Sequence, residues 1–282
     1  MRAISDMENQ HNNTSNELRY AYVTVITNMS YFKGLLVLAN SMKRVKARFP
    51  FYVLVPKSVS AELRDSILSL DLPILEYEDI LLDQKLQNAN AVTSWNQTFF
   101  KLNIMRLTQF DKIIFVDADM LLLQNIDHLF SYPSLSATTG GKAAHPEYTE
   151  FNSGLLVVEP SEEIFEKLMG CIELAVKRKT ARGLGYGDQD VFNEYYSDWN
   201  QKTECHFSEI YNAEITYLDA LMQSHGFKNM GDVAVLHYIG KTKIWNHSLI
   251  ENIRIIHGCL HEHKRFEAKA RMLYLWRLYL KR

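Results

Sequence analysis

Strand patterns and helix patterns alternate along the first third of the chain, and this alternation limits the possible folds more than any other feature. The predicted elements follow one another through short turns: strands at 20–27, 49–56 and 73–80, and helices at 28–45 and 61–70, the second of them capped by Ser60. Such alternation is typical of βαβ units with a parallel sheet. The sequence therefore predicts an α/β fold in which helices flank a mostly parallel sheet.

Two carboxylates interrupt the apolar run IIFVDADMLL at 113–122, which follows a predicted helix at 99–108 and which we expect to be the fourth strand. Asp117 and Asp119 lie where KIIFV ends, and ligands of parallel α/β sheets bind beyond the carboxyl ends of the strands. Side chains two residues apart on an extended backbone point to the same side. The pair can therefore share a hard cation; helix capping or surface exposure is the alternative for so short a pattern.

His237 ends the apolar run VAVLH of the last predicted core strand, 233–240, and is a third candidate ligand. An imidazole with two carboxylates suits Mn²⁺ better than Ca²⁺, and Mg²⁺ is the second candidate ion. A histidine that is simply buried at the rim of the core is the alternative. Gly240, Lys241 and Lys243 follow in a turn that either brings cations and backbone N–H groups onto a diphosphate or is a solvated basic turn.

Asp188 and Gln189 lie where GLGYGDQDVF passes from a glycine-rich turn into a predicted short helix. A carboxylate at this point either caps the helix or faces a ligand. Gln189 has no obvious structural reason to be there.

Five motifs occur in a fixed order along the chain: AYVTVITNMSYFKGLLVLANSM, FFKLNIMRLTQFDKIIFVDADMLLLQNIDHLF, FNSGLLVVEPS, GYGDQDVFN and LHYIGKTKIWN. In this order and at these separations they resemble glycosyltransferase family 8, the retaining nucleotide-sugar transferases that include glycogenin. The resemblance runs from about Ala21 to Asn246. It implies a single GT-A domain, in which a Rossmann-like nucleotide-binding half is merged with an acceptor-binding half.

The resemblance also implies roles for single residues. Asp117, Asp119 and His237 look like the metal ligands, and Asp188 and Gln189 look like the pair beside the anomeric carbon. The donor-binding positions that it implies are Val25, Thr27, Asn28 and Tyr31 around the uracil and ribose, Lys101, Ala118 within the aspartate motif, Asn152, Ser153 and Gly154 near the sugar, and Gly240 and Lys243 at the diphosphate.

Three positions depart from the family pattern. Tyr238 stands where the family often has Phe, Ile244 where it usually has Pro, and Asp190 where glycogenin has Gly. We expect the first change to be mild and the second to loosen the lysine turn. The third suggests a different acceptor.

The function that the resemblance implies is a retaining, Mn²⁺-dependent transfer of a hexose from a UDP-sugar to a glycan acceptor. The metal and Lys243 would neutralise the UDP leaving group, and Lys101 would contact the donor. Gln189 is a poor nucleophile, so we expect attack from the leaving-group face with Asp188 positioning the sugar or acceptor. Two alternatives stay open: a glycogenin-like primer that glucosylates itself on tyrosines such as Tyr211 or Tyr217, and a metal-dependent nucleotidyl or phosphoryl transferase.

The two ends of the chain differ in composition from the middle. Residues 1–18 are polar and without periodicity, which predicts a disordered lead; the GT-A domain is expected at 19–248 and a helical tail at 249–282. Basic and aromatic residues alternate in this tail. It either binds an anionic membrane surface, in which case the acceptor is a lipid-linked glycan, or packs its apolar face on the domain.

The net charge and the cysteine content exclude some classes of partner and of metal site. A formal net charge of −2 argues against nucleic acid as a partner, and three cysteines without a C-x-x-C pair suggest neither a disulfide framework nor a zinc site. A reducing compartment fits this cysteine usage. Without an apolar leader or an apolar run of about 18 residues, we expect a cytoplasmic protein that is soluble or peripheral to the membrane. A homodimer is a further expectation.

Overall fold

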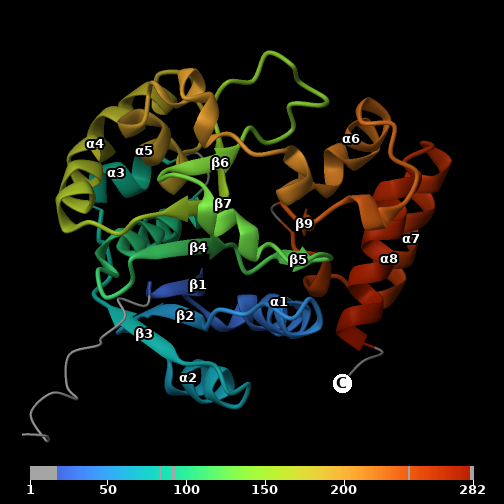
Figure 1. Cartoon of the computed structure of the whole chain (residues 1–282), viewed down its shortest axis with the longest axis horizontal. Coiled ribbons are helices and arrows are strands. Elements are labelled where there is room, and N and C mark those ends of the chain that lie inside the picture. Colours follow the sequence, from blue (N-terminus) through green and yellow to red (C-terminus); the bar gives the residue numbers. More distant parts are fainter. Residues whose placement is uncertain (1–17, 83, 91–92, 241, 280–282) are drawn as a thin grey trace, which may run out of the picture.

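A six-stranded sheet is the larger of two sheets in the molecule (Figure 1). The computed structural model of the protein describes residues 18–82, 84–90, 93–240 and 242–279, so the predicted disordered lead lies, apart from Leu18, outside the described residues. The strands of the sheet, in spatial order, are β3 (Ile74–Tyr77), β2 (Phe51–Pro56), β1 (Tyr20–Val25), β4 (Lys112–Val116), β7 (Asn152–Val158) and β6 (Ser136–Thr138). The first four are parallel, whereas β7 and β6 run antiparallel to their neighbours.

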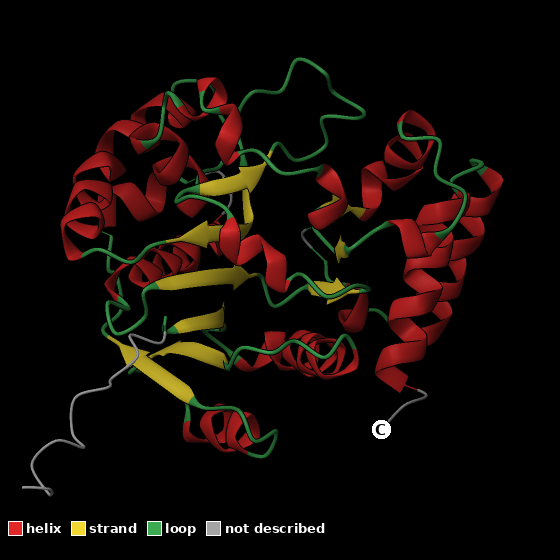
Figure 2. Cartoon of the chain, viewed as in Figure 1, coloured by secondary structure: helices red, strands yellow, loops and turns green. Residues whose placement is uncertain are grey.

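Helices surround this sheet on both faces and form a separate group at the C-terminal side (Figure 2). They are α1 (Phe32–Arg44), α2 (Ala61–Leu68), α3 (Gln84–Ala89), α4 (Glu162–Thr180), α5 (Asp188–Tyr195), α6 (Leu218–Ser224), α7 (Leu249–His261) and α8 (Arg265–Tyr279). Ser60 caps α2, since its hydroxyl accepts a hydrogen bond from the Leu63 N–H. The helix predicted at 99–108 is a 3₁₀ helix, η2 (Thr93–Arg106), which begins earlier than expected.

The predicted fourth strand, 113–122, is two strands in two sheets. β4 ends at Val116, the backbone turns through the two aspartates, and β5 (Met120–Leu122) enters a smaller sheet. There it pairs with β9 (Val235–His237), which also pairs with β8 (Ala213–Glu214). The last predicted core strand, 233–240, is therefore shorter than expected and belongs to the smaller sheet. The aspartates lie at the junction of the two sheets.

Both faces of β4 are buried, which explains its uninterrupted apolar sequence. Ile113 and Phe115 pack in one cluster with residues of η2 and α4. Ile114 and Val116 pack in another cluster, with Leu38 of α1. This double burial fixes the end of β4 firmly beneath the aspartate turn.

Apolar residues of α8 pack against the domain. Tyr274, Leu275 and Leu278 are buried in a cluster that includes Tyr238 and Trp245. The packing alternative therefore describes α8. On α7 four apolar side chains are exposed, Leu249, Ile250, Ile253 and Leu260. Among the described residues, no helix combines the length and apolarity needed to cross a membrane.

The departure at Tyr238 has a structural explanation and a measurable consequence. Its hydroxyl donates a 2.9 Å hydrogen bond to the buried Ala270 carbonyl, and its ring lies 4.4 Å from that of Tyr274. We expect Tyr238→Phe to lower the free energy of unfolding by about 1 kcal/mol and to leave turnover unchanged. Tyr274→Phe is the matched control, because the Tyr274 hydroxyl has no hydrogen-bond partner among the described residues. Equal stability of the two variants in denaturant titrations would contradict this role.

Candidate functional site

Strand direction brings distant parts of the sequence to one edge of the larger sheet. β1 and β4 are parallel, so Val25 and Val116 end at the same edge. β7 is antiparallel to β4, so its first residue, Asn152, begins at this edge. The Asp117 N–H donates to the Gly154 carbonyl at 2.8 Å and extends this pairing beyond β4.

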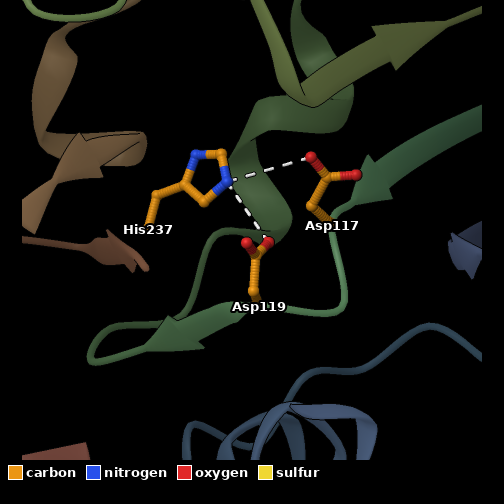
Figure 3. A group of neighbouring side chains, drawn as sticks. All are labelled: Asp117, Asp119 and His237. Carbon is orange, nitrogen blue, oxygen red and sulfur yellow. Dashed lines mark ion pairs between the residues drawn. The ribbon is translucent and has the colours of Figure 1, made fainter. Parts of the chain in front are cut away.

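Three side chains meet at the junction of the two sheets and present their ligand atoms to one another (Figure 3). His237 Nε2 lies 3.2 Å from Asp119 Oδ1 and 3.8 Å from Asp117 Oδ2. The possible ligand atoms of the three residues all lie within 4.8 Å of one another. Asp119 and His237 are buried, whereas a quarter of the Asp117 side chain is exposed. A cation held here would be reached from the Asp117 side.

Two lysines hold the outer carboxylate oxygens of the same aspartates. Lys101 Nζ lies 3.0 Å from Asp117 Oδ1, and Lys243 Nζ donates to Asp119 Oδ2 at 2.5 Å. The two remaining oxygens, Asp117 Oδ2 and Asp119 Oδ1, are those that face His237. Each carboxylate therefore contacts a lysine with one oxygen and directs the other toward His237.

The charged groups shift one another's pKa values in opposite directions. Burial raises the pKa of Asp117 above its ordinary value, against the opposing effect of Lys101. For Asp119 the effect of burial is outweighed by Lys243 and His237, so its pKa lies below the ordinary value. Burial alone would lower the pKa of Lys101, but Asp117 and Asp188 raise it. Lys101 therefore stays a cation at neutral pH.

Asp188 faces this site and does not cap its helix. Its carboxylate accepts a 2.7 Å hydrogen bond from the Ser153 hydroxyl and lies 2.9 Å from Lys101 Nζ. Gly187 is the N-cap residue of α5, and its N–H donates to Asp190 at 2.8 Å. The capping alternative for Asp188 is therefore wrong.

Asp190 and Gln189 also have clear partners. Asp190 pairs with Lys179 of α4 at 2.8 Å in addition to its bond with the Gly187 N–H. These contacts give Asp190 a structural role in joining α4 to α5. The Gln189 side-chain oxygen accepts a 3.2 Å hydrogen bond from the Ser153 N–H. This bond connects α5 to the start of β7.

The residues after β1 form a polar rim. Thr27 and Asn28 both donate to the Gln97 side-chain oxygen, at 3.3 and 3.0 Å. Asn28 also caps the short 3₁₀ helix Met29–Tyr31 by accepting from the Ser30 N–H. Val25 is the last residue of β1 and is partly buried. Gln97 thus connects Thr27 and Asn28. Gln97 was not predicted from the sequence as part of this rim.

Tyr31 and Ala118 lie on the α1 side of the site. The Tyr31 ring packs edge-on against Trp245, with the centroids 6.1 Å apart. Burial raises the pKa of Tyr31, while the nearby Lys243 opposes the increase. Ala118 packs in the cluster of Ile26, so its side chain belongs to the core. Only its backbone is available to a ligand.

The turn after β9 places Lys243 beside Asp119. Gly240 has a φ of +127°, a conformation that requires glycine. Lys241 lies outside the described residues. Ile244 is buried, and its carbonyl accepts a 3.0 Å hydrogen bond from the Asn252 side chain of α7. We expected Ile244 to loosen this turn, but in the structure its side chain is packed.

A buried polar network behind the triad was missed in the sequence. His237 Nδ1 lies 2.8 Å from Asn212 Oδ1, the Asn212 amide donates to Asn152 Oδ1 at 2.8 Å, and the Asn152 amide donates to Glu214 Oε1 at 3.2 Å. Burial raises the pKa of Glu214. Asn212 and Glu214 flank a single alanine in the two-residue strand β8, which is too short to give a periodic pattern.

Gly154 has no room for a side chain. A Cβ at this position would lie 2.5 Å from His237 Cε1 and 2.8 Å from Met120 Cε. We expect Gly154→Ala to displace the His237 ring, to weaken Mn²⁺ binding at least tenfold and to lower the free energy of unfolding by about 1–3 kcal/mol. Gly170→Ala is the control, because no atom lies within 4 Å of the point that a Cβ would occupy there. Calorimetric titration with Mn²⁺ and thermal melts measure both effects; wild-type affinity in Gly154→Ala would show that the histidine is not held by this contact.

The chain is similar to known proteins over most of its length. The sequence profile described as "Glycosyl transferase family 8" matches residues 22–248. Glycogenin-1 of Mus musculus is 32% identical over 238 residues, which are 81% of this chain and 66% of that protein. Putative UDP-glucuronate:xylan alpha-glucuronosyltransferase 3 of Arabidopsis thaliana is 32% identical over 232 residues, 80% of this chain and 34% of that protein. The chain thus spans less than two thirds of the length of these relatives.

Solved structures share the fold at lower sequence identity. The galactosyltransferase LgtC, in complex with donor and acceptor sugar analogs, superposes with a TM-score of 0.58 at 19% identity and covers 82% of this chain and 91% of its own. The glycosyltransferase GlyE of Streptococcus pneumoniae TIGR4 gives 0.55 at 20% identity, with 81% and 57% covered. At this identity the likeness concerns the fold alone.

Proposed function

The chain belongs to glycosyltransferase family 8, with the GT-A fold that its sequence predicts, and from this we propose a retaining, Mn²⁺-dependent enzyme that transfers a hexose from a UDP-sugar to a glycan acceptor. Family membership supports glycosyltransferase activity with a nucleotide-sugar donor and a glycan acceptor. It favours glycosyl transfer over the nucleotidyl or phosphoryl transfer that the paired aspartates left open. The observation that carries the proposal is the convergence of Asp117, Asp119 and His237 ligand atoms within 4.8 Å.

The donor set of the triad fits Mn²⁺. Two carboxylate oxygens and one imidazole nitrogen suit a cation that accepts both oxygen and nitrogen ligands, whereas Ca²⁺ and Mg²⁺ prefer oxygen alone. Asp117 is the most exposed of the three residues, so we expect the diphosphate to reach the metal from its side. When bound, the metal would supply positive charge to the UDP leaving group.

The proposal extends to the remaining expected donor residues, which would bind the rest of the UDP-sugar. In the proposed arrangement Val25, Thr27, Asn28 and Tyr31 surround the uracil and ribose, Ala118 offers its backbone, and Gly240 and Lys243 contact the diphosphate. Asn152, Ser153 and Gly154 lie beside the sugar. Lys101 links this group to Asp188, because its ammonium contacts both Asp117 and Asp188.

We infer that the acceptor attacks from the face that UDP leaves. The bond between the anomeric carbon and the β-phosphate oxygen breaks, a bond from the acceptor oxygen to the same carbon forms on that face, and the acceptor proton passes to the departing phosphate oxygen. Lys243 stabilises the negative charge on this phosphate. Gln189 is a neutral amide whose oxygen already accepts from the Ser153 N–H, which supports a positioning role; Asp188 orients the sugar or acceptor.

The exposed apolar side chains of α7 support an acceptor that is presented at a membrane. Ile250, Ile253 and Leu260 are exposed on α7, which also carries the exposed cation Arg254, and the exposed Arg265 begins α8. We propose that this face docks on an anionic bilayer at the cytoplasmic side and that the acceptor is a lipid-linked glycan. Cosedimentation with phosphatidylserine vesicles tests this extension, and Ile253→Glu should abolish the cosedimentation.

We also propose a homodimer, which analytical ultracentrifugation tests.

The deciding experiment is a UDP-release assay with a panel of UDP-hexoses, with Mn²⁺, with Mg²⁺ and with EDTA. We expect release from one sugar that requires the metal, and NMR of the product should show the anomeric configuration of the donor. Metal-independent release or an inverted product would contradict the proposal. Silence with every sugar, both alone and with glycan acceptors, would overturn it.

The likeness to Glycogenin-1 favours one second candidate, self-glucosylation. Of the two tyrosines considered, Tyr211 has its hydroxyl hydrogen-bonded to His128 at 2.8 Å. The Tyr217 ring packs edge-on against His145. Intact-protein mass spectrometry after incubation with UDP-glucose and Mn²⁺ distinguishes the two functions, because only a self-acting primer gains hexose increments, and Tyr217→Phe would remove them if that residue is the acceptor.

A further inference from the structure

The buried network behind His237 joins the candidate metal ligand to a carboxylate that the proposed reaction does not use. We propose that Glu214, acting through Asn152 and Asn212, fixes His237 with its proton on Nδ1 and so keeps Nε2 free to bind the metal. The inference rests on the proposed function in one respect, the role of His237 as a ligand. Glu214 and Asn212 are positioning residues, since neither touches the ligand atoms of the triad.

The Gly154 N–H determines which groups of the network donate hydrogen bonds and which accept them. Its backbone N–H can only donate, and it donates to the Asn152 side-chain oxygen at 2.8 Å. The Asn152 oxygen is therefore oriented toward Gly154, and its NH₂ group is left to face Glu214 Oε1 at 3.2 Å. An ionised carboxylate can only accept. Both ends of the Asn152 amide thus fix the same orientation.

The orientation of the Asn152 amide determines that of the Asn212 amide, which in turn determines which His237 nitrogen carries the proton. Asn212 must offer its NH₂ group to the Asn152 oxygen, at 2.8 Å, so its own oxygen faces His237 Nδ1, also at 2.8 Å. A carbonyl oxygen accepts only, so Nδ1 carries the proton. Nε2 is then the ring nitrogen left to bind a cation, and it lies 3.2 Å from Asp119 Oδ1.

Burial makes this arrangement costly to reverse. Asn212 is 1% exposed, His237 4% and Glu214 7%, so a flipped amide would bring like groups together with little water to separate them. The strands hold the two ends in place, because Glu214 of β8 lies beside His237 of β9 in the parallel pairing. Removing an outer-shell partner of a metal-binding histidine typically weakens metal binding by about 10- to 100-fold.

The test is the affinity for Mn²⁺ alone, measured from the electron paramagnetic resonance signal of the free ion. We expect Asn212→Leu and Glu214→Leu each to bind Mn²⁺ about 10- to 100-fold more weakly than the wild type. Glu214→Gln should stay within about threefold, because the amide oxygen still accepts from Asn152. Asn103→Leu is the matched control: Asn103 is equally buried, but its amide donates to the backbone carbonyls of Glu78 and Phe100 and is not part of this network.

Nitrogen NMR of the metal-free protein with labelled histidine gives a second readout that does not depend on metal. The signal that disappears in His237→Gln should report a proton on Nδ1 in the wild type. It should move toward Nε2–H in Asn212→Leu. An Nε2–H ring in the wild type would overturn the inference.

Failure of the inference and failure of the proposed function give different results. If the wild type binds Mn²⁺, His237→Gln does not, and both leucine variants bind as the wild type does, the inference is wrong and the proposed metal site stands. A Glu214→Gln variant as weak as Glu214→Leu would also contradict it, because polarity would then not be the cause. If His237→Gln binds Mn²⁺ like the wild type, the proposed metal site is wrong.

Discussion

Asp119→Asn is expected to lower kcat/KM for the UDP-sugar about a thousandfold, equivalent to about 4 kcal/mol of transition-state stabilisation, and to leave the fold intact. The substitution keeps the shape of the side chain and removes the negative charge that Lys243 and His237 both face. An amide oxygen is a far weaker metal ligand than a carboxylate, so the cation would lose one of its two anionic ligands. UDP release at increasing Mn²⁺ concentration measures the loss, and excess Mn²⁺ should restore it only in part.

Asp111→Asn is the matched control for Asp119→Asn. Asp111 pairs with Arg19 at 2.8 Å and precedes β4, at the end of the strand opposite to the candidate site. We expect its turnover and metal dependence to equal those of the wild type. A loss of less than tenfold in Asp119→Asn, with a melting curve like that of the wild type, would show that this aspartate does not hold the catalytic cation.

Lys101→Met should destabilise the protein as well as inactivate it. Its ammonium is the cation between the Asp117 and Asp188 carboxylates, and methionine would leave the partly buried Asp117 and the buried Asp188 without a cation between them. Breaking a buried pair in this way costs about 3–5 kcal/mol. In a chain of this size that loss corresponds to a decrease in melting temperature of roughly 10 °C. Calorimetry at neutral pH measures it, and the UDP-release assay measures the expected loss of donor turnover.

The double variant Lys101→Met with Asp188→Asn separates charge repulsion from lost packing. With one carboxylate neutralised, the repulsion disappears and stability should recover by at least half, whereas turnover should stay low because two proposed catalytic residues are missing. Equal melting temperatures for the single and double variants would mean that the lysine stabilises the fold through its packing on Phe115, 4.8 Å from the ammonium, and not through its charge.

Local sequence patterns predicted the fold where burial is uniform. The apolar residues of β4 were recognised as a strand, because a strand covered on both faces is a continuous apolar run, although the predicted strand, 113–122, continued past the end of β4 at Val116. The same reasoning was wrong for 113–122, since the residues of β5 are equally buried and apolar but pair in another sheet. Nothing in a run of apolar residues specifies which strand it will pair with.

The candidate site could be predicted only where chemistry coincides with the end of an element. Asp117, Asp119 and His237 were found because each follows or ends an apolar run, and the structure brings these three together. Asn212 and Glu214 escaped detection because a two-residue strand has no measurable period. Asp188 could not be decided locally: the first turn of a helix suits a capping carboxylate and a ligand-facing carboxylate equally, and only the position of Lys101 distinguishes them.

The order of strands in the smaller sheet has a consequence for how the protein is made. Its middle strand, β9, is the last of the three to leave the ribosome, long after β5 and after β8. Until Val235 to His237 emerge, β5 and β8 have no partner in that sheet, while all six strands of the larger sheet are already available. A translational pause or a premature stop before β9 should therefore leave a nascent chain that lacks His237 and cannot form the smaller sheet, so that cation binding reports synthesis past β9.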